Sequence, residues 1–250
     1  MELHGEHKHT GDAGTAMAKI ILNFDSYQST SQASYYYTFL GFQLEVTEGD
    51  DQNTHRVAVL TDGPEYDREQ IRPLYRFVSA LCWKYNMPVY VGRLTACGHN
   101  AGDASEPRRY DRITGYAVPT GLFEPHSTEQ EIAMGLYREA KSSDSPFYSF
   151  LAFYQILELK PGKKSNRQDW INSNLASLTK SKRQLEEVRQ AKAQLNVGKR
   201  IVELRNGVAH AVAERPIDID GYPHLRELNI LRFVIEELAE RFMVDALGFT

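Results

Sequence analysis

The chain has 250 residues, of which 42% are hydrophobic and 25% are charged, and its net charge is −4 at pH 7. These proportions are typical of a soluble globular protein, and the length is enough for one large domain or two small ones. No apolar run approaches the roughly 18 residues of a membrane-spanning helix, and the N-terminus lacks the apolar core of a secretory signal. We therefore expect a cytoplasmic protein without a membrane partner, in which Cys82 and Cys97 form no Cys-x-x-Cys pair and stay reduced.

Residues 1–16 contain three closely spaced histidines, His4, His7 and His9, among polar residues and glycine. Three histidines are enough ligands for a metal ion, but a metal site also needs a backbone that fixes their geometry. This segment has no hydrophobic pattern that would provide one. We expect a mobile tail rather than a metal site, and we find no cofactor motif in the rest of the chain.

Residues 17–119 mix two kinds of pattern. Apolar residues recur at helical spacing between Glu69 and Tyr85, and β-branched and aromatic residues dominate several short segments on either side. The predicted strands are residues 18–24, 35–47, 56–61 and 87–94. This order indicates a small α/β or α+β domain. The domain has no glycine-rich phosphate loop and no nucleophile elbow, so its sequence leaves its role open.

Residues 127–250 have helical patterns throughout, and Pro119–Pro125 forms the connection to them. Ser127 is followed by the acidic and amide residues of a helix start, and Ser145–Pro146 is a second such start. The predicted helices are residues 127–141, 145–160, 169–178, 185–213 with a break near 196–198, and 225–247. Short connections between helices indicate a bundle. The sequence thus predicts an α+β protein whose C-terminal half is all-α.

The most informative segment is Arg205-Asn206-Gly207-Val208-Ala209-His210, within the fourth of these helices. Arginine stays charged at any working pH and can bind two phosphate oxygens at once. Histidine, with an ordinary pKa of about 6.5, can donate or accept a proton near neutrality. Asn206 and His210 are four residues apart and therefore share a helix face. These are the groups that RNA cleavage without a metal requires.

A second arginine–histidine pair, Arg93 and His99, has similar spacing. It extends from a predicted strand into a turn, and Leu94 follows the arginine where Asn206 follows Arg205. Spacing alone is weak evidence, because an exposed arginine and a histidine at a helix end are common in any helical protein. We therefore place the candidate site at Arg205.

The segment from Glu203 to Ala211, after a helical hairpin that opens at Ser145–Leu151, resembles the HEPN superfamily of small helical bundles. Its signature is an arginine, a polar residue and then a histidine. Many members are metal-independent endoribonucleases of toxin–antitoxin, phage-defence and CRISPR systems, and others are inactive binding modules. The whole layout also resembles a bacterial family named after methylamine-utilisation protein J. No cofactor or metal motif in this chain supports a role in methylamine metabolism.

Positive charge is concentrated just before the motif. Residues 160–200 contain eleven basic and three acidic residues, a net charge of +8. Such a block can attract a polyanion, although a solvated lysine- and arginine-rich helix surface is common. We predict that RNA contacts the side chains of Lys163, Lys164, Lys180, Lys182 and Arg183.

The resemblance and the chemistry both imply a homodimer. Attack of a ribose 2′-hydroxyl on the adjacent phosphate needs a base, an acid and positive charge on the transition state. One motif supplies a single histidine, whereas a two-fold dimer through residues 127–250 brings Arg205, Asn206 and His210 together twice. We therefore expect a ribonuclease that leaves 2′,3′-cyclic phosphate ends, acting as a prokaryotic defence or toxin effector. No metal takes part.

A second interpretation stays open. The bundle would then be an inactive HEPN-like module that binds a nucleotide or a partner protein. Residues 17–119 would act as a sensor in that case, and an antitoxin, a phage component or a small molecule would be the trigger. The presence of Arg205, Asn206 and His210 together favours the ribonuclease.

Overall fold

In the computed structural model the chain forms two compact units. The sheet unit comprises residues 1–77 and 90–120, and the helical unit comprises residues 78–89 and 121–250. The residues described are 17–23, 34–47, 55–60, 71–86, 88–97, 121–160, 164–191, 195–209 and 222–250. The expected tail at residues 1–16, the connection at 119–120, Lys163 and His210 lie outside them.

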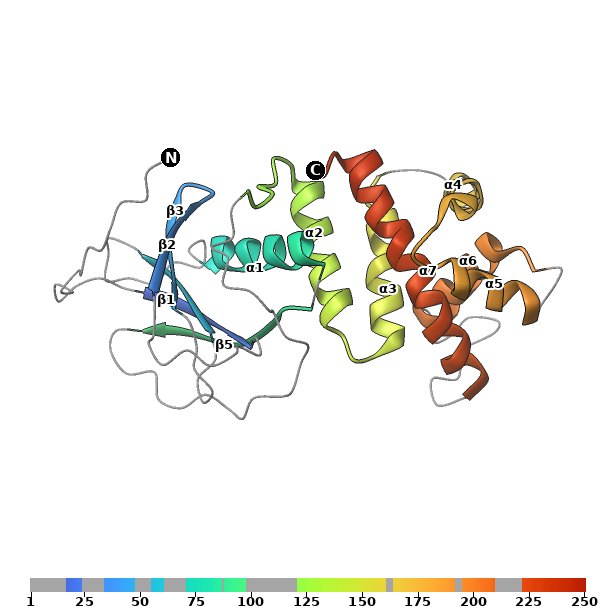
Figure 1. Cartoon of the computed structure of the whole chain (residues 1–250), viewed down its shortest axis with the longest axis horizontal. Coiled ribbons are helices and arrows are strands. Elements are labelled where there is room, and N and C mark those ends of the chain that lie inside the picture. Colours follow the sequence, from blue (N-terminus) through green and yellow to red (C-terminus); the bar gives the residue numbers. More distant parts are fainter. Residues whose placement is uncertain are drawn as a thin grey trace. The chain divides into compact units, whose positions relative to one another are not determined.

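The described residues of the sheet unit form five antiparallel strands in the order β2-β3-β4-β1-β5, and Figure 1 draws them as arrows. The strands are β1 (Met17–Asn23), β2 (Ser34–Phe39), β3 (Phe42–Thr47), β4 (His55–Leu60) and β5 (Tyr90–Cys97). The first strand is therefore inserted between β4 and β5, which follow it in the chain. A sheet of antiparallel pairs in one unit and a group of helices in the other confirm the α+β class.

One predicted strand is wrong in its extent. Residues 35–47 do not form one long bent strand, because β2 and β3 are joined by a tight hairpin at Leu40 and Gly41. Both turn residues have positive φ, 51° and 79°, as a two-residue type I′ turn requires. The hairpin was missed because asparagine or aspartate usually occupies the first turn position, and leucine gives no such signal.

Helix α1 (Ile71–Tyr85) begins in the sheet unit and ends in the helical unit. In the sheet unit, Phe77 lies edge-on to Phe39, with ring centroids 5.6 Å apart. The side chains of Leu44, Val57 and Val59 are fully buried in the same unit. Burial of large apolar side chains from the strands and the helix makes this the core of the unit.

The helical unit is a bundle in which α3 and α7 pack along each other and α2 flanks them (Figure 1). The helices are α2 (Thr128–Ser142), α3 (Pro146–Leu157), α4 (Lys164–Asn174), α5 (Lys182–Ala191), α6 (Val197–Ala209) and α7 (Tyr222–Leu247), with a short 3₁₀ turn at Leu175–Ser177. Within the described residues, no helix has both the length and the apolar sequence to cross a bilayer.

The starts of α2 and α3 confirm two predicted helix boundaries. The Ser127 hydroxyl accepts a hydrogen bond from the backbone of Gln130 at 3.2 Å, and Pro146 occupies the first position of α3. By contrast, α4 begins at Lys164, five residues before the predicted start at Asp169. The first turn of α4 is polar and shows no helical spacing of apolar residues, so its sequence gave no signal.

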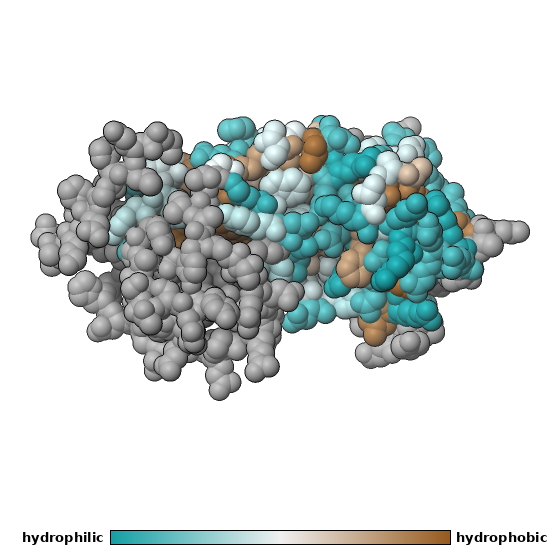
Figure 2. All heavy atoms as spheres, viewed as in Figure 1, coloured by the Kyte–Doolittle hydropathy of each residue, from teal (hydrophilic) through white to brown (hydrophobic). Residues whose placement is uncertain are grey.

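Few large apolar side chains are exposed among the described residues of the helical unit. In Figure 2, hydrophilic residues cover most of its described surface on the face shown, and apolar colour is limited to small areas. The exposed apolar side chains of this unit include Ile132, Tyr148, Phe233 and Val244. Isolated exposed apolar residues are normal on a water-solvated surface.

The predicted break near residues 196–198 is confirmed. Asn196 caps α6, since its side-chain oxygen accepts a hydrogen bond from the backbone of Lys199 at 2.8 Å. Gly198, in the first turn, lies against α4, where its backbone N–H donates to the side chain of Asn172. A Cβ atom at Gly198 would lie 2.4 Å from the side-chain oxygen of Asn172. Only glycine allows this close approach.

We expect Gly198→Ala to lower the free energy of unfolding by about 1 kcal/mol, because the new methyl group displaces the side chain of Asn172 and breaks its hydrogen bond. Gly135→Ala is the matched control. Gly135 lies in α2, where an added Cβ meets no atom within 4 Å, and alanine there should stabilise the helix by up to about 1 kcal/mol. Urea unfolding of both variants measures the difference. Equal effects would contradict the tight contact.

Candidate functional site

Arg205 and Asn206 lie near the C-terminal end of α6, and His210 follows the last described residue of that helix, Ala209. The guanidinium of Arg205 donates a hydrogen bond to the side-chain oxygen of Asn206, with Nη1 and Oδ1 3.3 Å apart. Both side chains are partly buried. Two of the three predicted catalytic side chains therefore interact directly, and the third continues the same chain segment.

The same guanidinium also contacts a residue that the sequence did not suggest. Glu158 follows the last turn of α3, and its Oε2 lies 2.9 Å from Nη2 of Arg205. Its other oxygen, Oε1, lies 3.4 Å from Nη1 of Arg167 on α4. One carboxylate thus bridges two guanidinium groups from different helices. This cluster joins α3, α4 and α6 in space.

An aromatic ring completes the cluster. The central carbons of the Arg205 and Arg167 guanidiniums lie 5.8 and 5.9 Å from the centroid of the Tyr154 ring, which is within the range of cation–π attraction. Burial raises the pKa of the Tyr154 phenol, whereas the charges of Arg167 and Arg205 act to lower it. We call Tyr154, Glu158, Arg167, Arg205 and Asn206 the arginine cluster.

The arginine cluster is partly open to solvent. The side chains of Arg167, Arg205 and Glu158 are 16%, 23% and 24% exposed, so part of each lies at the surface. Two guanidiniums against one carboxylate leave a net charge of +1. Moreover, Nε of Arg205 is buried and has no hydrogen-bond acceptor among the described residues. The cluster therefore has both a surplus positive charge and an unused donor.

Sequence reasoning missed Glu158, Tyr154 and the specific role of Arg167. In the sequence, Arg167 is one of the eleven basic residues of the segment 160–200, and Tyr154 is one of many apolar or aromatic residues in a predicted helix. One signal was available for Glu158. A carboxylate at the C-terminal end of a helix is disfavoured by the partial negative charge there, so its presence indicates a compensating cation.

The residues that were predicted to contact RNA are not part of the arginine cluster. Lys180 forms an ion pair with Glu240 of α7, and that hydrogen bond raises the pKa of the lysine. Lys182 and Arg183 are exposed in the first turn of α5. In the part of the chain that the structure describes, no hydrogen bond or ion pair joins these three to Arg205. Of Lys164 only the backbone is described, at the start of α4.

Other basic residues of the +8 segment are neutralised by acidic partners. Arg200 forms two hydrogen bonds with Glu227 of α7, at 2.8 and 2.6 Å, and these raise the pKa of the arginine. Lys199 lies 3.9 Å from Glu203 on the same helix. The excess of positive charge in the sequence is thus smaller in space, because acidic residues from outside the segment pair with it.

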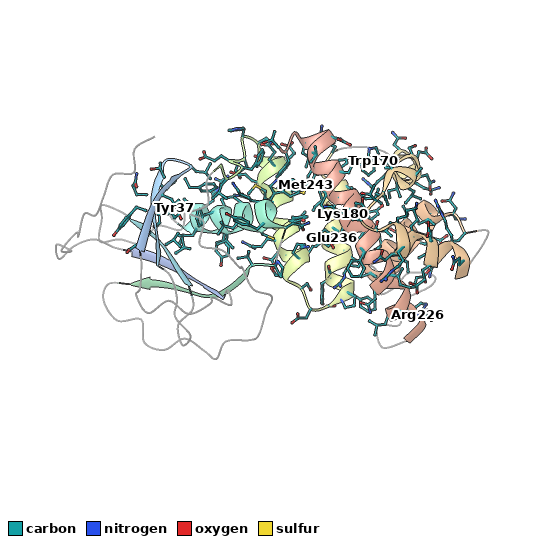
Figure 3. The ribbon with its side chains drawn as sticks, viewed as in Figure 1. Tyr37, Trp170, Lys180, Arg226, Glu236 and Met243 are labelled. Carbon is teal, nitrogen blue, oxygen red and sulfur yellow. The ribbon has the colours of Figure 1, made fainter. Side chains whose placement is uncertain are left out.

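A cleft of about 600 Å³ lies elsewhere in the helical unit and does not include the arginine cluster. It follows α7, and its lining includes Trp83, Tyr137, Lys180, Glu240 and Asp245. A smaller cavity of about 170 Å³ shares Lys180 and Glu240 with it and also includes Glu236; Figure 3 labels Lys180 and Glu236 close to α7. The acidic residues Glu236 and Glu240 are paired with cations, Lys141 and Lys180.

Glu237, beside this cleft, binds the start of α5. Its carboxylate accepts hydrogen bonds from the backbone N–H groups of Thr179, Lys180 and Ser181, at 2.7, 3.1 and 2.7 Å. The hydroxyl groups of Thr179 and Ser181 donate to it as well. Burial alone would raise the pKa of Glu237, but these hydrogen bonds outweigh it and lower the pKa to about 2. Glu237 therefore fixes the position of α5 on α7.

The chain is thus an α+β protein whose helical bundle contains a partly exposed arginine cluster. The cluster includes the first two residues of the arginine–asparagine–histidine motif. Residues 133–244 match a family model described as methylamine utilization protein MauJ. This match confirms the resemblance to that family over a segment that includes Glu158, Arg167 and Arg205. No curated protein and no solved structure matched the chain.

Proposed function

We propose that this protein is a metal-independent endoribonuclease of the HEPN type, with Arg205, Asn206 and His210 as its catalytic residues. The observation that carries the proposal is the arrangement at the end of α6. Arg205 is held there by Glu158, Tyr154 and Asn206 in a partly exposed, positively charged cluster. His210 follows α6 directly, four residues after Asn206.

Each group has a defined task in the proposed reaction. A histidine from one chain removes the proton of the ribose 2′-hydroxyl, whose oxygen attacks the adjacent phosphorus atom. The guanidinium of Arg205 stabilises the negative charge that develops on the phosphorane oxygens. A second histidine, from the other chain of a two-fold dimer, protonates the leaving 5′-oxygen. The products are a 2′,3′-cyclic phosphate and a free 5′-hydroxyl. Asn206 orients His210 or donates to a phosphate oxygen.

We expect the purified protein to cleave single-stranded RNA in excess EDTA, because the proposed groups supply acid, base and positive charge themselves. The products should carry 2′,3′-cyclic phosphate ends. An RNA ligase that requires such ends should therefore join an adapter to the products. DNA of the same sequence, which lacks the 2′-hydroxyl, should stay intact and serves as the control. Cleavage that depends strictly on added Mg²⁺ or Mn²⁺ would contradict the mechanism.

One observation favours the alternative, an inactive module that binds a nucleotide or a partner protein. Arg205 is neutralised by Glu158 at 2.9 Å, as in a structural ion pair. Under this alternative RNA would stay intact at every protein concentration, and expression of the protein would not slow bacterial growth. Growth that slows with the wild type and recovers with Arg205→Ala would contradict the alternative.

A further inference from the structure

The carboxylate of Glu158 lies where a phosphate group would fit. Each of its oxygens faces one guanidinium, at 2.9 Å from Arg205 and 3.4 Å from Arg167. A phosphate group presents its oxygens to two arginines in the same way, with shorter and stronger hydrogen bonds than neutral groups make. We propose that Arg167 and Arg205 form a clamp for a phosphate of the RNA backbone, and that Glu158 occupies this clamp until RNA displaces it.

This inference rests on the proposed function for the identity of the ligand, and it assigns two residues that the catalytic motif does not contain. Arg167 becomes the second cation of the site. Glu158 becomes a positioning residue that holds both arginines in the absence of RNA and lowers their affinity for other anions.

Both arginines have other contacts that would keep them in place after Glu158 leaves. Nε of Arg167 donates to the backbone oxygen of Leu157 at 3.3 Å. Arg205 donates to Asn206 and lies over the Tyr154 ring. A clamp whose side chains are held independently of their occupant is preorganised for another anion.

Glu158 itself is held less firmly than the arginines. It follows the last turn of α3, where the exposed carbonyl groups carry partial negative charge that disfavours a carboxylate. Its side chain is 24% exposed, so it can turn toward water. The arginine pair is the only described partner that offsets this electrostatic cost. When a phosphate displaces Glu158, the two arginines exchange one anion for another, and little electrostatic stabilisation is lost.

The unused donor of Arg205 is the second argument. Its Nε is buried and has no acceptor among the described residues while Glu158 is in place, and such a group is costly to leave unsatisfied. Glu158 already uses Nη2, and Asn206 uses Nη1. A phosphate has more oxygens than a carboxylate and can accept from Nε and Nη2 together, in the forked geometry that arginine favours.

The test measures binding of an RNA that cannot be cleaved. We would titrate a fluorescein-labelled 2′-O-methyl RNA with full-length protein at several NaCl concentrations and follow fluorescence anisotropy. Glu158→Gln keeps the shape of the side chain but removes its charge, and we expect binding about 5- to 10-fold tighter at low salt. Arg167→Gln should bind about tenfold more weakly, with a salt slope smaller by about 0.7, as expected for one lost contact to a single strand.

A matched control lies on the same helix. Arg200 forms a similar partly buried ion pair with Glu227, with side chains 22% and 14% exposed. Glu227→Gln removes one negative charge from beside Arg200, as Glu158→Gln does beside Arg205, but Arg200 keeps its contact with Glu203 at 3.5 Å and is not part of the clamp. RNA affinity should stay at the wild-type value. Equal tightening in both variants would mean that the loss of any one negative charge suffices, and it would overturn the clamp.

Further outcomes separate the clamp from the proposed function. A folded Glu158→Gln protein that binds RNA no more tightly than wild type would overturn the clamp, even if the protein cleaves RNA. Tighter binding without any cleavage would leave the clamp intact and reject the nuclease. A change in affinity for inorganic phosphate alone would overturn the assignment to RNA. Should Glu158→Gln unfold, as circular dichroism would detect, Arg167→Gln decides the question, and wild-type affinity in that variant would overturn the clamp.

Discussion

Replacing Arg205 with alanine should lower the rate of RNA cleavage at least about 100-fold, and His210→Ala should do the same. The arginine supplies positive charge where the phosphorane develops it, and the histidine transfers the proton, so each loss removes about 2.7 kcal/mol or more of transition-state stabilisation. Gel analysis of labelled RNA under single-turnover conditions measures the rate. Arg205→Lys keeps the positive charge but loses the forked pair of N–H donors. Its cleavage rate should lie between the rates of the wild type and of Arg205→Ala.

Two controls keep this result specific. Lys199→Ala removes an exposed cation from the same helix, with 66% of its side chain accessible, and should leave the rate unchanged. Arg205→Ala also removes the ion pair with Glu158, so its folding must be checked by thermal unfolding. If Arg93→Ala abolished cleavage while Arg205→Ala did not, the site would belong to the other arginine–histidine pair. Arg93 lies in strand β5, as its sequence predicted.

Mixing the two inactive variants tests the two-chain site. A dimer of one Arg205→Ala chain and one His210→Ala chain holds one intact arginine and one intact histidine in its shared cleft. We expect partial recovery of cleavage after the subunits exchange. A protein that stays monomeric in light scattering and cleaves RNA at the full rate would contradict the dimer. The second acid–base group would then have to lie in the same chain.

Glu237→Ala should lower the free energy of unfolding by about 2–4 kcal/mol, the largest stability effect that we expect from one surface-proximal residue. The variant leaves the backbone N–H groups of Thr179, Lys180 and Ser181 without their common acceptor at the start of α5. Urea unfolding at neutral pH measures the loss. Glu187→Ala is the control, because Glu187 forms an exposed ion pair with Arg226 that is worth at most about 1 kcal/mol.

The same carboxylate makes stability depend on pH. The pKa of Glu237 is lowered from 4.5 to about 2, so the ionised form is favoured in the folded protein. Its stabilisation is fully present above pH 4.5 and is lost as the pH falls toward 2. The difference in unfolding free energy between wild type and Glu237→Ala should therefore be largest near neutrality and shrink below pH 4. A constant difference across this range would contradict the lowered pKa.

Much of the helical unit could be predicted because its boundaries depend on local chemistry. The side chains of Ser127 and Asn196 accept hydrogen bonds from backbone N–H groups three residues later, and so mark helix starts. Pro146 marks another start, because proline lacks the N–H group that would have no partner in the first turn. The hairpin at Leu40–Gly41 could not be predicted, because strand pairing imposes positive φ on a residue that rarely adopts it.

The candidate site was predictable only where its residues are close in sequence. Arg205, Asn206 and His210 lie within six consecutive residues, and their spacing is visible in the chain. Glu158 and Arg167 reach the same point from two other helices, and only the packing of α3, α4 and α6 brings them there. Contacts between residues far apart in sequence leave no spacing pattern for a single sequence to reveal.

The last turns of α1 decide where the helical bundle can be cut out of the chain. The Trp83 ring packs edge-on against Tyr137 and Phe249, with centroids 5.3 and 5.1 Å away. A little further on, the backbone N–H of Val89 donates to the hydroxyl of Ser142. A fragment that starts at residue 127 would lose these contacts and expose two aromatic rings to water. The bundle is therefore discontinuous in sequence, and ribosomal synthesis completes one part of its core long before the rest.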